Sequence, residues 1–161
     1  RIAYFKVHYP LAFYSAYFTI RAAADFDAAL VMRGEAACRR ELERLEAKGN
    51  EASAKEKGVV TVLEVVLEAM ARGIRFLPVD LYASDVDRFK IEGDALRCPF
   101  AALQGVGAAA AQAIVAARSE RPFTSIEDLQ RRGKATKTVI EALAEHGARA
   151  QLPATDQIAL F

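Results

Sequence analysis

The chain has 161 residues, of which 53% are hydrophobic, 27% charged and 9% aromatic, and its formal net charge is +1. The apolar fraction excludes intrinsic disorder, and the length allows one domain or two small ones with a real core. Cys38 and Cys98 are too few for a disulfide framework or a zinc site, which fits a reducing, cytoplasmic compartment. The chain starts with Arg1 rather than Met and shows no signal-peptide pattern, so we expect a piece of a longer protein.

The first half of the chain predicts helices. Pro10 suits the first turn of a helix, and the aromatic residues that follow it recur three and four apart. Residues 59–70 are rich in β-branched side chains, which favour a strand. The length of the segment and the spacing of Glu64 and Glu68 favour a buried helix instead. The expected helices are 11–20, a segment from Asp25 or Asp27 interrupted at Gly34, an amphipathic helix over 35–48, and 59–70.

The second half predicts a short extended region and then further helices. Residues 74–82 are expected to be extended, and the alternation over 88–97 around Gly93-Asp94 is typical of a β-hairpin. The later expected elements are a turn or short helix at 99–103, helices over 108–118, from Thr124 or Ser125, and over 136–146, and a polar tail over 151–161. The predicted fold class is mainly α with a small β-hairpin or sheet.

An uncharged stretch over 98–117 approaches the length of a membrane span. Its apolar content is mostly alanine, and it contains Pro99, Gln104 and two glycines. A turn followed by an alanine-rich helix explains it better, so no membrane partner is expected.

The turn Gly105-Val106-Gly107 leads into the expected helix at Ala108. Glycine permits the positive φ of a tight turn and lets another backbone approach, while Val106 can pack inward. The free amides and the dipole at a helix N-terminus favour an anion. The pattern therefore predicts a phosphate-binding turn formed by Gly105, Val106, Gly107 and Ala108.

Three interpretations of this turn remain open. The run 105–110 matches a dinucleotide-binding pattern, but that fold requires a strand before the turn and a parallel strand after the helix. A helix–hairpin–helix motif, which grips a nucleic-acid phosphate, requires helices on both sides, and these are expected. A helical connector without any ligand would carry the same glycines.

Basic residues concentrate shortly after this turn, although the whole chain is nearly neutral. A second break at Gly133 would make a degenerate copy of the first hairpin. Cations beside phosphate-binding turns are typical of sequence-independent binding to duplex DNA. The candidate DNA-binding side chains here are Arg131, Arg132, Lys134 and Lys137.

Several runs together resemble a known family. LQGVG at 103–107 and EDLQRRGK at 127–134 resemble the tandem helix–hairpin–helix region of bacterial replicative DNA polymerase III alpha subunits of the PolC type. HYPLAFYSAYF at 8–18 and VDLYASD at 79–85 resemble the end of the fingers region. The resemblance implies the end of the fingers over 1–97, a tandem helix–hairpin–helix unit over 98–150, and a flexible tail over 151–161.

The terminal QIALF at 157–161 resembles the pentapeptide that docks on the sliding clamp (the beta subunit), although Ile158 stands where leucine is common. The resemblance assigns clamp binding to Gln157, Ile158, Leu160 and Phe161. Apolar anchors on a short extended peptide are a known recognition mode. The alternative is that this tail folds back onto its own domain.

The resemblance implies a non-catalytic role for this chain. The palm aspartates that bind Mg²⁺ and transfer deoxynucleotides lie upstream in the family, so no catalytic or metal-binding residue and no cofactor are expected here. The expected partners are duplex DNA, the sliding clamp and other replisome subunits. The alternative functions are a free-standing helix–hairpin–helix module of a repair or recombination protein and a small dinucleotide-binding protein.

Overall fold

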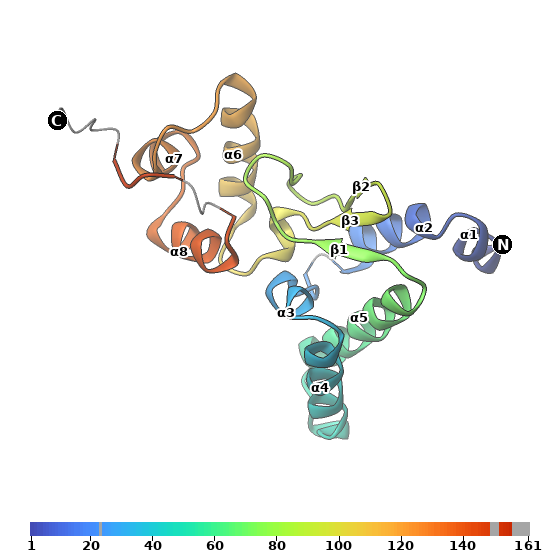
Figure 1. The fold of residues 1–161 in the computed structure, drawn as a ribbon. Coiled ribbons are helices and arrows are strands. Elements are labelled where there is room, and N and C mark those ends of the chain that lie inside the picture. Colours follow the sequence, from blue (N-terminus) through green and yellow to red (C-terminus); the bar gives the residue numbers. More distant parts are fainter. Residues whose placement is uncertain (23, 149–151, 156–161) are drawn as a thin grey trace.

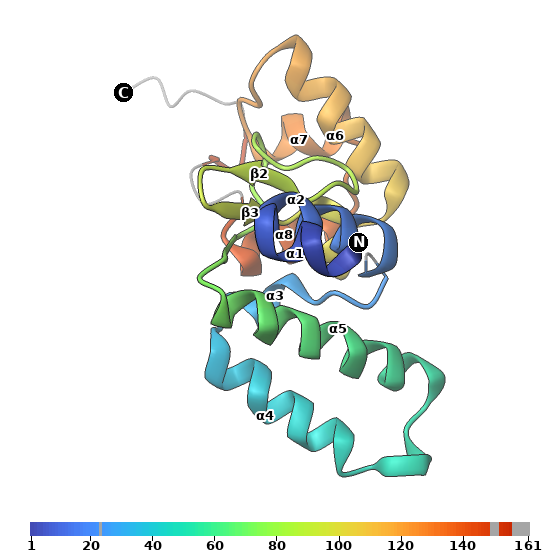
Figure 2. The ribbon, with the colours of Figure 1, turned by 90° about the vertical axis from the view of Figure 1, so that its right-hand side faces the viewer.

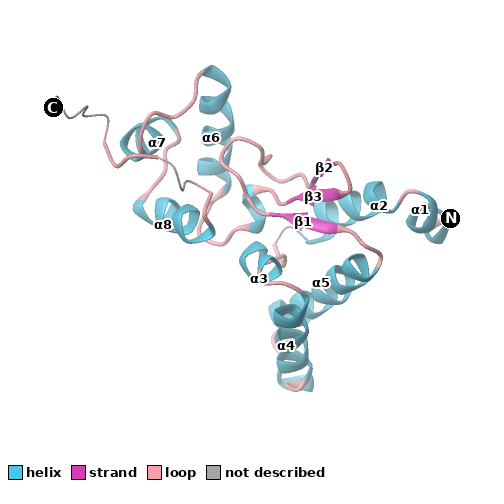
Figure 3. Cartoon of the chain, viewed as in Figure 1, coloured by secondary structure: helices cyan, strands magenta, loops and turns pink. Residues whose placement is uncertain are grey.

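The computed structural model describes residues 1–22, 24–148 and 152–155, with the side chain of residue 22 left out, and it is mainly helical around one small sheet (Figures 1 and 3). This confirms the predicted fold class. The α-helices are α1 (Ile2–His8), α2 (Pro10–Tyr17), α3 (Ala28–Met32), α4 (Glu35–Glu46), α5 (Ala54–Ala71), α6 (Ala108–Glu120), α7 (Ile126–Arg132) and α8 (Lys137–His146). The strands are β1 (Arg75–Leu77), β2 (Lys90–Glu92) and β3 (Ala95–Arg97), and short helical turns cover Phe18–Ala22, Gly49–Glu51 and Phe100–Ala102.

The N-terminal helices differ from the prediction at two points. The first helix, α1, was not expected, because apolar residues fill most positions of its sequence IAYFKVH and show no helical periodicity; none of them is buried in the structure. It ends at Tyr9 (φ −135°, ψ 59°), since the ring of Pro10 disfavours helical dihedrals in the preceding residue. The helix expected over 11–20 is α2 from Pro10 to Tyr17, followed by a π-helical turn.

Helices α4 and α5 pack together and project from the rest of the molecule (Figures 1 and 2). The predicted helix over 59–70 is confirmed and is longer, because Ser53 and Glu56 form a capping box that starts α5 at Ala54. Burial of Val62 and Val66 in the core outweighs the preference of β-branched residues for strands.

The predicted hairpin is confirmed: β2 and β3 are antiparallel, and Gly93 (φ +62°) lies in the turn between them. The sheet has a third strand in the order β1-β3-β2, and β1 pairs parallel to β3 with Phe76 opposite Leu96. The sequence predicts only an extended region for β1, because this parallel pairing joins segments that are distant in the chain.

One hydrophobic cluster runs from Tyr14 in α2 to Leu143 in α8. Phe18 is fully buried in it and contacts the rings of Phe26, Phe76 and Phe89, with ring centroids 5.4–5.5 Å apart. Leu96 and Cys98, on either side of the domain boundary expected between residues 97 and 98, both belong to this cluster. Helices α6, α7 and α8 lie together at one end of the molecule (Figure 1). Within the described ranges, no helix is long and apolar enough to cross a membrane.

Candidate nucleic-acid interface

The first hairpin, residues 103–107, connects the turn Phe100–Ala102 to α6. Its geometry requires glycine at position 105, because φ there is +93° and a Cβ would lie 3.1 Å from the Cβ of Ala142 in α8. The side chain of Val106 is buried, 7% exposed, as expected from its inward packing. Burial of this side chain holds the turn while Gly105 and Gly107 stay exposed on either side.

The first turn of α6 presents uncapped backbone amides. Gly107 is the N-cap (φ −75°, ψ 164°) and has no side chain to cap the helix. A Cβ at Gly107 would meet nothing within 4 Å, so the space in front of these amides is open. The first hydrogen bond of this 13-residue helix runs from the Ala111 N–H to the Gly107 carbonyl oxygen, 3.0 Å. The amides of residues 108–110 therefore have no acceptor within the helix. Together with the helix dipole, this geometry favours an anion.

The second hairpin, residues 133–136, connects α7 to α8 and differs in detail. Lys134 adopts the left-handed region at φ +49°, whereas Gly133 has φ −88°. Glycine is needed at 133 for close packing, because a Cβ would lie 2.7 Å from the Leu129 carbonyl oxygen. Thr136 is the N-cap of α8, and its hydroxyl accepts the Val139 N–H at 3.4 Å.

The two hairpins pack in a reciprocal way. Gly105 of the first hairpin lies against Ala142 and Thr138 of α8, and Gly133 of the second lies against Ile114 of α6. Each hairpin therefore rests on the helix that follows the other. Because Thr138 belongs to the first turn of α8, this packing brings the first hairpin next to the start of the helix that the second hairpin introduces.

The predicted basic residues fall into two groups. Arg131, Lys134 and Lys137 are exposed, with 65% of the Arg131 side chain and 88% of the Lys137 side chain accessible. The Arg132 side chain is only 12% exposed. Its guanidinium donates to the carbonyl oxygens of Ala117 (2.6 Å) and Arg121 (3.0 Å) and lies over the ring of Phe123. The internal contacts of Arg132 support a role in holding the hairpins together rather than in binding DNA.

Asp128 organises the connection between α6 and α7. Its buried carboxylate pairs with Arg121 (3.2 Å), Arg131 (3.0 Å) and Arg132 (3.0 Å) and accepts the Thr124 N–H. Burial acts to raise the pKa of this carboxyl, but the Thr124 N–H and the arginines outweigh it and hold the pKa well below its usual range. The sequence indicates only an acidic residue in a first helical turn here. A signal was present, because arginines three and four residues after Asp128 lie on its side of a helix.

The segment 79–85 joins the hairpin unit to the rest of the molecule. The Arg118 guanidinium donates to the Leu81 carbonyl oxygen at 3.0 Å, and the Phe123 N–H donates to the Tyr82 hydroxyl at 3.1 Å. The Val79 N–H donates to Nε2 of His146 at 2.9 Å, so this nitrogen is unprotonated. These bonds come from α6, from the α6–α7 connection and from the end of α8.

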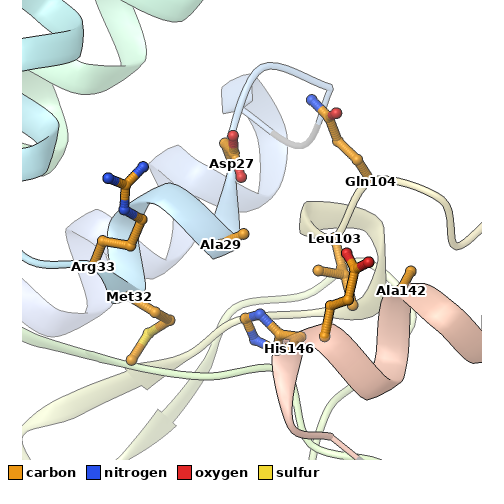
Figure 4. A pocket seen from close by; sticks show the side chains of 9 residues that line it. Asp27, Ala29, Met32, Arg33, Leu103, Gln104, Ala142 and His146 are labelled. Carbon is orange, nitrogen blue, oxygen red and sulfur yellow. The ribbon is translucent and has the colours of Figure 1, made fainter.

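A pocket of about 510 Å³ lies beside the first hairpin (Figure 4). Its lining side chains come from α3, from the hairpin residues Leu103 and Gln104, and from α8. Asp27 accepts the Leu30 N–H and so caps α3, and His146 is bound to Val79. We assign no ligand to this pocket, because these two polar groups already stabilise the fold.

The predicted clamp residues Gln157, Ile158, Leu160 and Phe161 lie outside the described residues. The beginning of the expected tail is described: Leu152 packs against the core, and Pro153 and Ala154 accept hydrogen bonds from α7. Thus residues 152–155 lie on the hairpin unit.

Two other sequence interpretations can be compared with the described ranges. No strand follows α6 within them, so the parallel strand that a dinucleotide-binding fold needs is missing there and this interpretation is wrong. Within the described ranges, no group of three or more His, Cys, Asp or Glu residues is placed so that it could hold a metal ion.

Comparison with known proteins places this geometry in a family. A family model described as a helix-hairpin-helix motif matches residues 73–157, more than half of the chain. The chain is 53% identical over all 161 residues to "DNA polymerase III PolC-type" of Halalkalibacterium halodurans, and 50% identical to the proteins of that name from Clostridium perfringens and Thermotoga maritima. It spans 11–12% of the length of these relatives. The chain therefore belongs to the helix–hairpin–helix family and corresponds over its whole length to about a tenth of PolC-type DNA polymerase III.

Proposed function

We propose that this chain is a non-catalytic part of a replicative DNA polymerase and holds duplex DNA by its backbone, without sequence preference. The observation that carries the proposal is the uncapped first turn of α6 behind Gly105 and Gly107. Its amides donate to one phosphate, and the dipole of α6 adds a favourable charge interaction.

The exposed cations of the second hairpin supply the rest of the interface. Lys134 and Lys137 flank the start of α8, against which the first hairpin packs, and Arg131 lies near the end of α7. Their charges neutralise neighbouring phosphates and release counterions. Of the residues that the sequence assigns to DNA binding, Gly105, Gly107, Ala108, Arg131, Lys134 and Lys137 keep that role, while Val106 and Arg132 support the hairpins from inside.

Replacing Ala108 tests the amide donors directly. Proline is tolerated at the first position of a helix, and the extended Gly107 before it is compatible with proline, so Ala108→Pro deletes one N–H with little change in fold. Ala108→Val, which keeps the N–H at similar bulk, is the matched control. We expect about a tenfold weaker binding of a fluorescent duplex by Ala108→Pro than by Ala108→Val, the loss for one hydrogen bond to a charged group. Equal affinities in folded variants would contradict the proposal.

We further propose that Gln157, Ile158, Leu160 and Phe161 dock on the sliding clamp. The support is the similarity of the whole chain to PolC-type polymerase III together with the residue types at these positions. Removing Leu160 and Phe161 is expected to abolish clamp binding and to leave the affinity for duplex DNA unchanged. Clamp binding that survives the deletion would contradict this role.

In this proposal the complete polymerase transfers deoxynucleotides with Mg²⁺, and it works in the cytoplasm with other replisome subunits. No residue of this chain takes part in the chemical step. The alternative is a free-standing helix–hairpin–helix module of a repair or recombination protein. Such a module requires similarity only over the motif at 73–157, whereas the similarity to the polymerases extends over the whole chain. This extent supports the polymerase.

A further inference from the structure

The start of α7 is capped by a distant segment of the chain. The Ile126 N–H donates to the Pro153 carbonyl oxygen at 2.8 Å, and the Glu127 N–H donates to the Ala154 carbonyl oxygen at 3.3 Å. The next amide, that of Asp128, donates to the Ser125 hydroxyl at 3.0 Å. All three amides of this first turn therefore have acceptors, two of them from the segment 152–155.

Apolar contact holds the same segment. Leu152 packs against the main hydrophobic cluster, and Ala148, two residues after the end of α8, packs there too. We call residues 152–155 the anchored segment. Its last hydrogen-bonded residue, Ala154, lies three positions before Gln157, whereas a tail that was free beyond Ala148 would span nine positions to that point.

Chain length then limits where a docked peptide can lie. Each residue spans at most about 3.5 Å, so the six residues after Thr155 reach about 20 Å at most. We infer that the anchored segment is a positioning device: it holds the clamp-docking peptide beside α7 and so places the clamp next to the hairpins that grip the duplex. This inference rests on the proposed docking of residues 157–161 on the sliding clamp.

A short tether has a measurable consequence. When one molecule binds both DNA and a clamp around that DNA, the second contact is intramolecular, and its effective concentration falls roughly as the −3/2 power of tether length. Lengthening the tether from the three positions between Ala154 and Gln157 to the nine between Ala148 and Gln157 lowers this effective concentration about fivefold. Binding to the clamp alone, without DNA, does not depend on this length.

The Ile126→Pro substitution weakens the anchor by removing the shorter of its two hydrogen bonds. Ser125 is extended (φ −158°, ψ 172°), which suits a following proline, and Ile126 is the first residue of α7, where proline is tolerated. The proline ring replaces the N–H and excludes the Pro153 carbonyl oxygen. Ile126→Ala is the matched control, because it loses the same side-chain packing and keeps the N–H.

The experiment uses the complete polymerase and measures two dissociation constants, one for the clamp without DNA and one for primed DNA loaded with the clamp. We expect Ile126→Pro and Ile126→Ala to bind the clamp alone equally well, and Ile126→Pro to bind clamp-loaded DNA more weakly, by up to about fivefold when the segment is fully released. Equal binding of the two variants to clamp-loaded DNA would overturn the inference. A difference in binding to the clamp alone would also overturn it, since the anchored segment would then belong to the docking peptide.

A second variant keeps the test independent of the stability of α7. Ten Gly/Ser residues inserted between Thr155 and Asp156 leave the anchor intact and lengthen the tether, so a several-fold weaker binding to clamp-loaded DNA is expected. Unchanged binding would overturn the inference. Failure of the proposed docking is recognised separately, because removal of Leu160 and Phe161 would then leave binding to the clamp alone intact.

Discussion

The two hairpins each lead into a helix and pack against each other's helices, but their chemistry differs. The first uses the left-handed Gly105 and a glycine N-cap, and the amides that it presents are open. The second places Lys134 in the left-handed region and caps α8 with Thr136. A threonine cap uses an amide that a phosphate would otherwise take, so in our proposal the second hairpin contributes side-chain charge and the first contributes main-chain donors. Two copies of one motif can thus bind the same ligand through different groups, one through backbone amides and the other through charged side chains.

The largest expected effect comes from removing the Asp128 carboxylate, which fixes the three arginines around the connection between α6 and α7. Asp128→Ala leaves Arg132, which is 12% exposed, without its buried partner, so we expect a loss of about 3–5 kcal/mol in the free energy of unfolding. Urea unfolding of the chain measures this loss.

The same carboxylate makes the stability depend on pH. Because the pKa of Asp128 is lowered in the fold, its contribution to the free energy of unfolding is present above the usual aspartate pKa of 3.8 and is lost as pH falls toward the folded-state pKa. A variant of parental stability at pH 7 would show that the cluster is not structural.

Replacing each of the three hairpin glycines with alanine compares how much the two hairpins depend on glycine for stability. Gly133→Ala forces a Cβ to 2.7 Å from a carbonyl oxygen, and about 2–3 kcal/mol of destabilisation is expected from the resulting strain. Gly105→Ala must adopt a positive φ, which costs about 1–2 kcal/mol. Gly107→Ala meets open space at φ −75°, and because alanine is a poorer N-cap than glycine it should cost less than about 1 kcal/mol. The opposite order in thermal unfolding would refute the assignment of Gly133 to packing.

The cations of the second hairpin are tested through salt dependence. Removing one side chain that neutralises a phosphate should reduce the slope of log affinity against log salt by about 0.9. We expect Arg131→Ala, Lys134→Ala and Lys137→Ala each to lower this slope, with equal effects on duplexes of unrelated sequence. Glu141→Gln, which lies beside Lys137 in α8, is a control that should not lower it. Fluorescence anisotropy over a salt series measures the slopes, and an unchanged slope in all three variants would place the duplex elsewhere.

The smallest expected effect concerns the attachment of the hairpin unit to the segment 79–85. Burial lowers the pKa of His146 below its usual 6.5, although the Asp27 carboxylate acts in the opposite direction. Since the folded state binds the proton less well than the unfolded state, the stability from this histidine is complete above pH 6.5 and falls as pH decreases below it. The Val79 bond is worth about 1 kcal/mol. His146→Gln should weaken this pH dependence between about pH 7 and 5, and a melting curve with the parental pH dependence would argue against it.

Sequence patterns predicted much of this fold because the signals were local. The turn at Gly93-Asp94, the helix ended by Gly147 and the cap at Ser125 each depend on dihedral angles and side chains within a few residues. The hairpin at 105–107 was predicted for the same reason, and the matching family model agrees with it. Helix α1 was missed, because all but one of its residues are exposed and no apolar periodicity marks it.

Local patterns also identified the groups of the candidate interface, which are a glycine turn before an alanine-rich helix and cations around a second turn. Only the tertiary structure decided which of these groups remain available. Arg132 and Arg131 are adjacent in sequence, yet one is enclosed and the other is exposed, because a helix turns about 100° per residue and only one side of α7 faces α6. The parallel pairing of β1 with β3 and the capping of α7 by residues 153–154 likewise join distant segments, and such contacts depend on packing that no local pattern encodes.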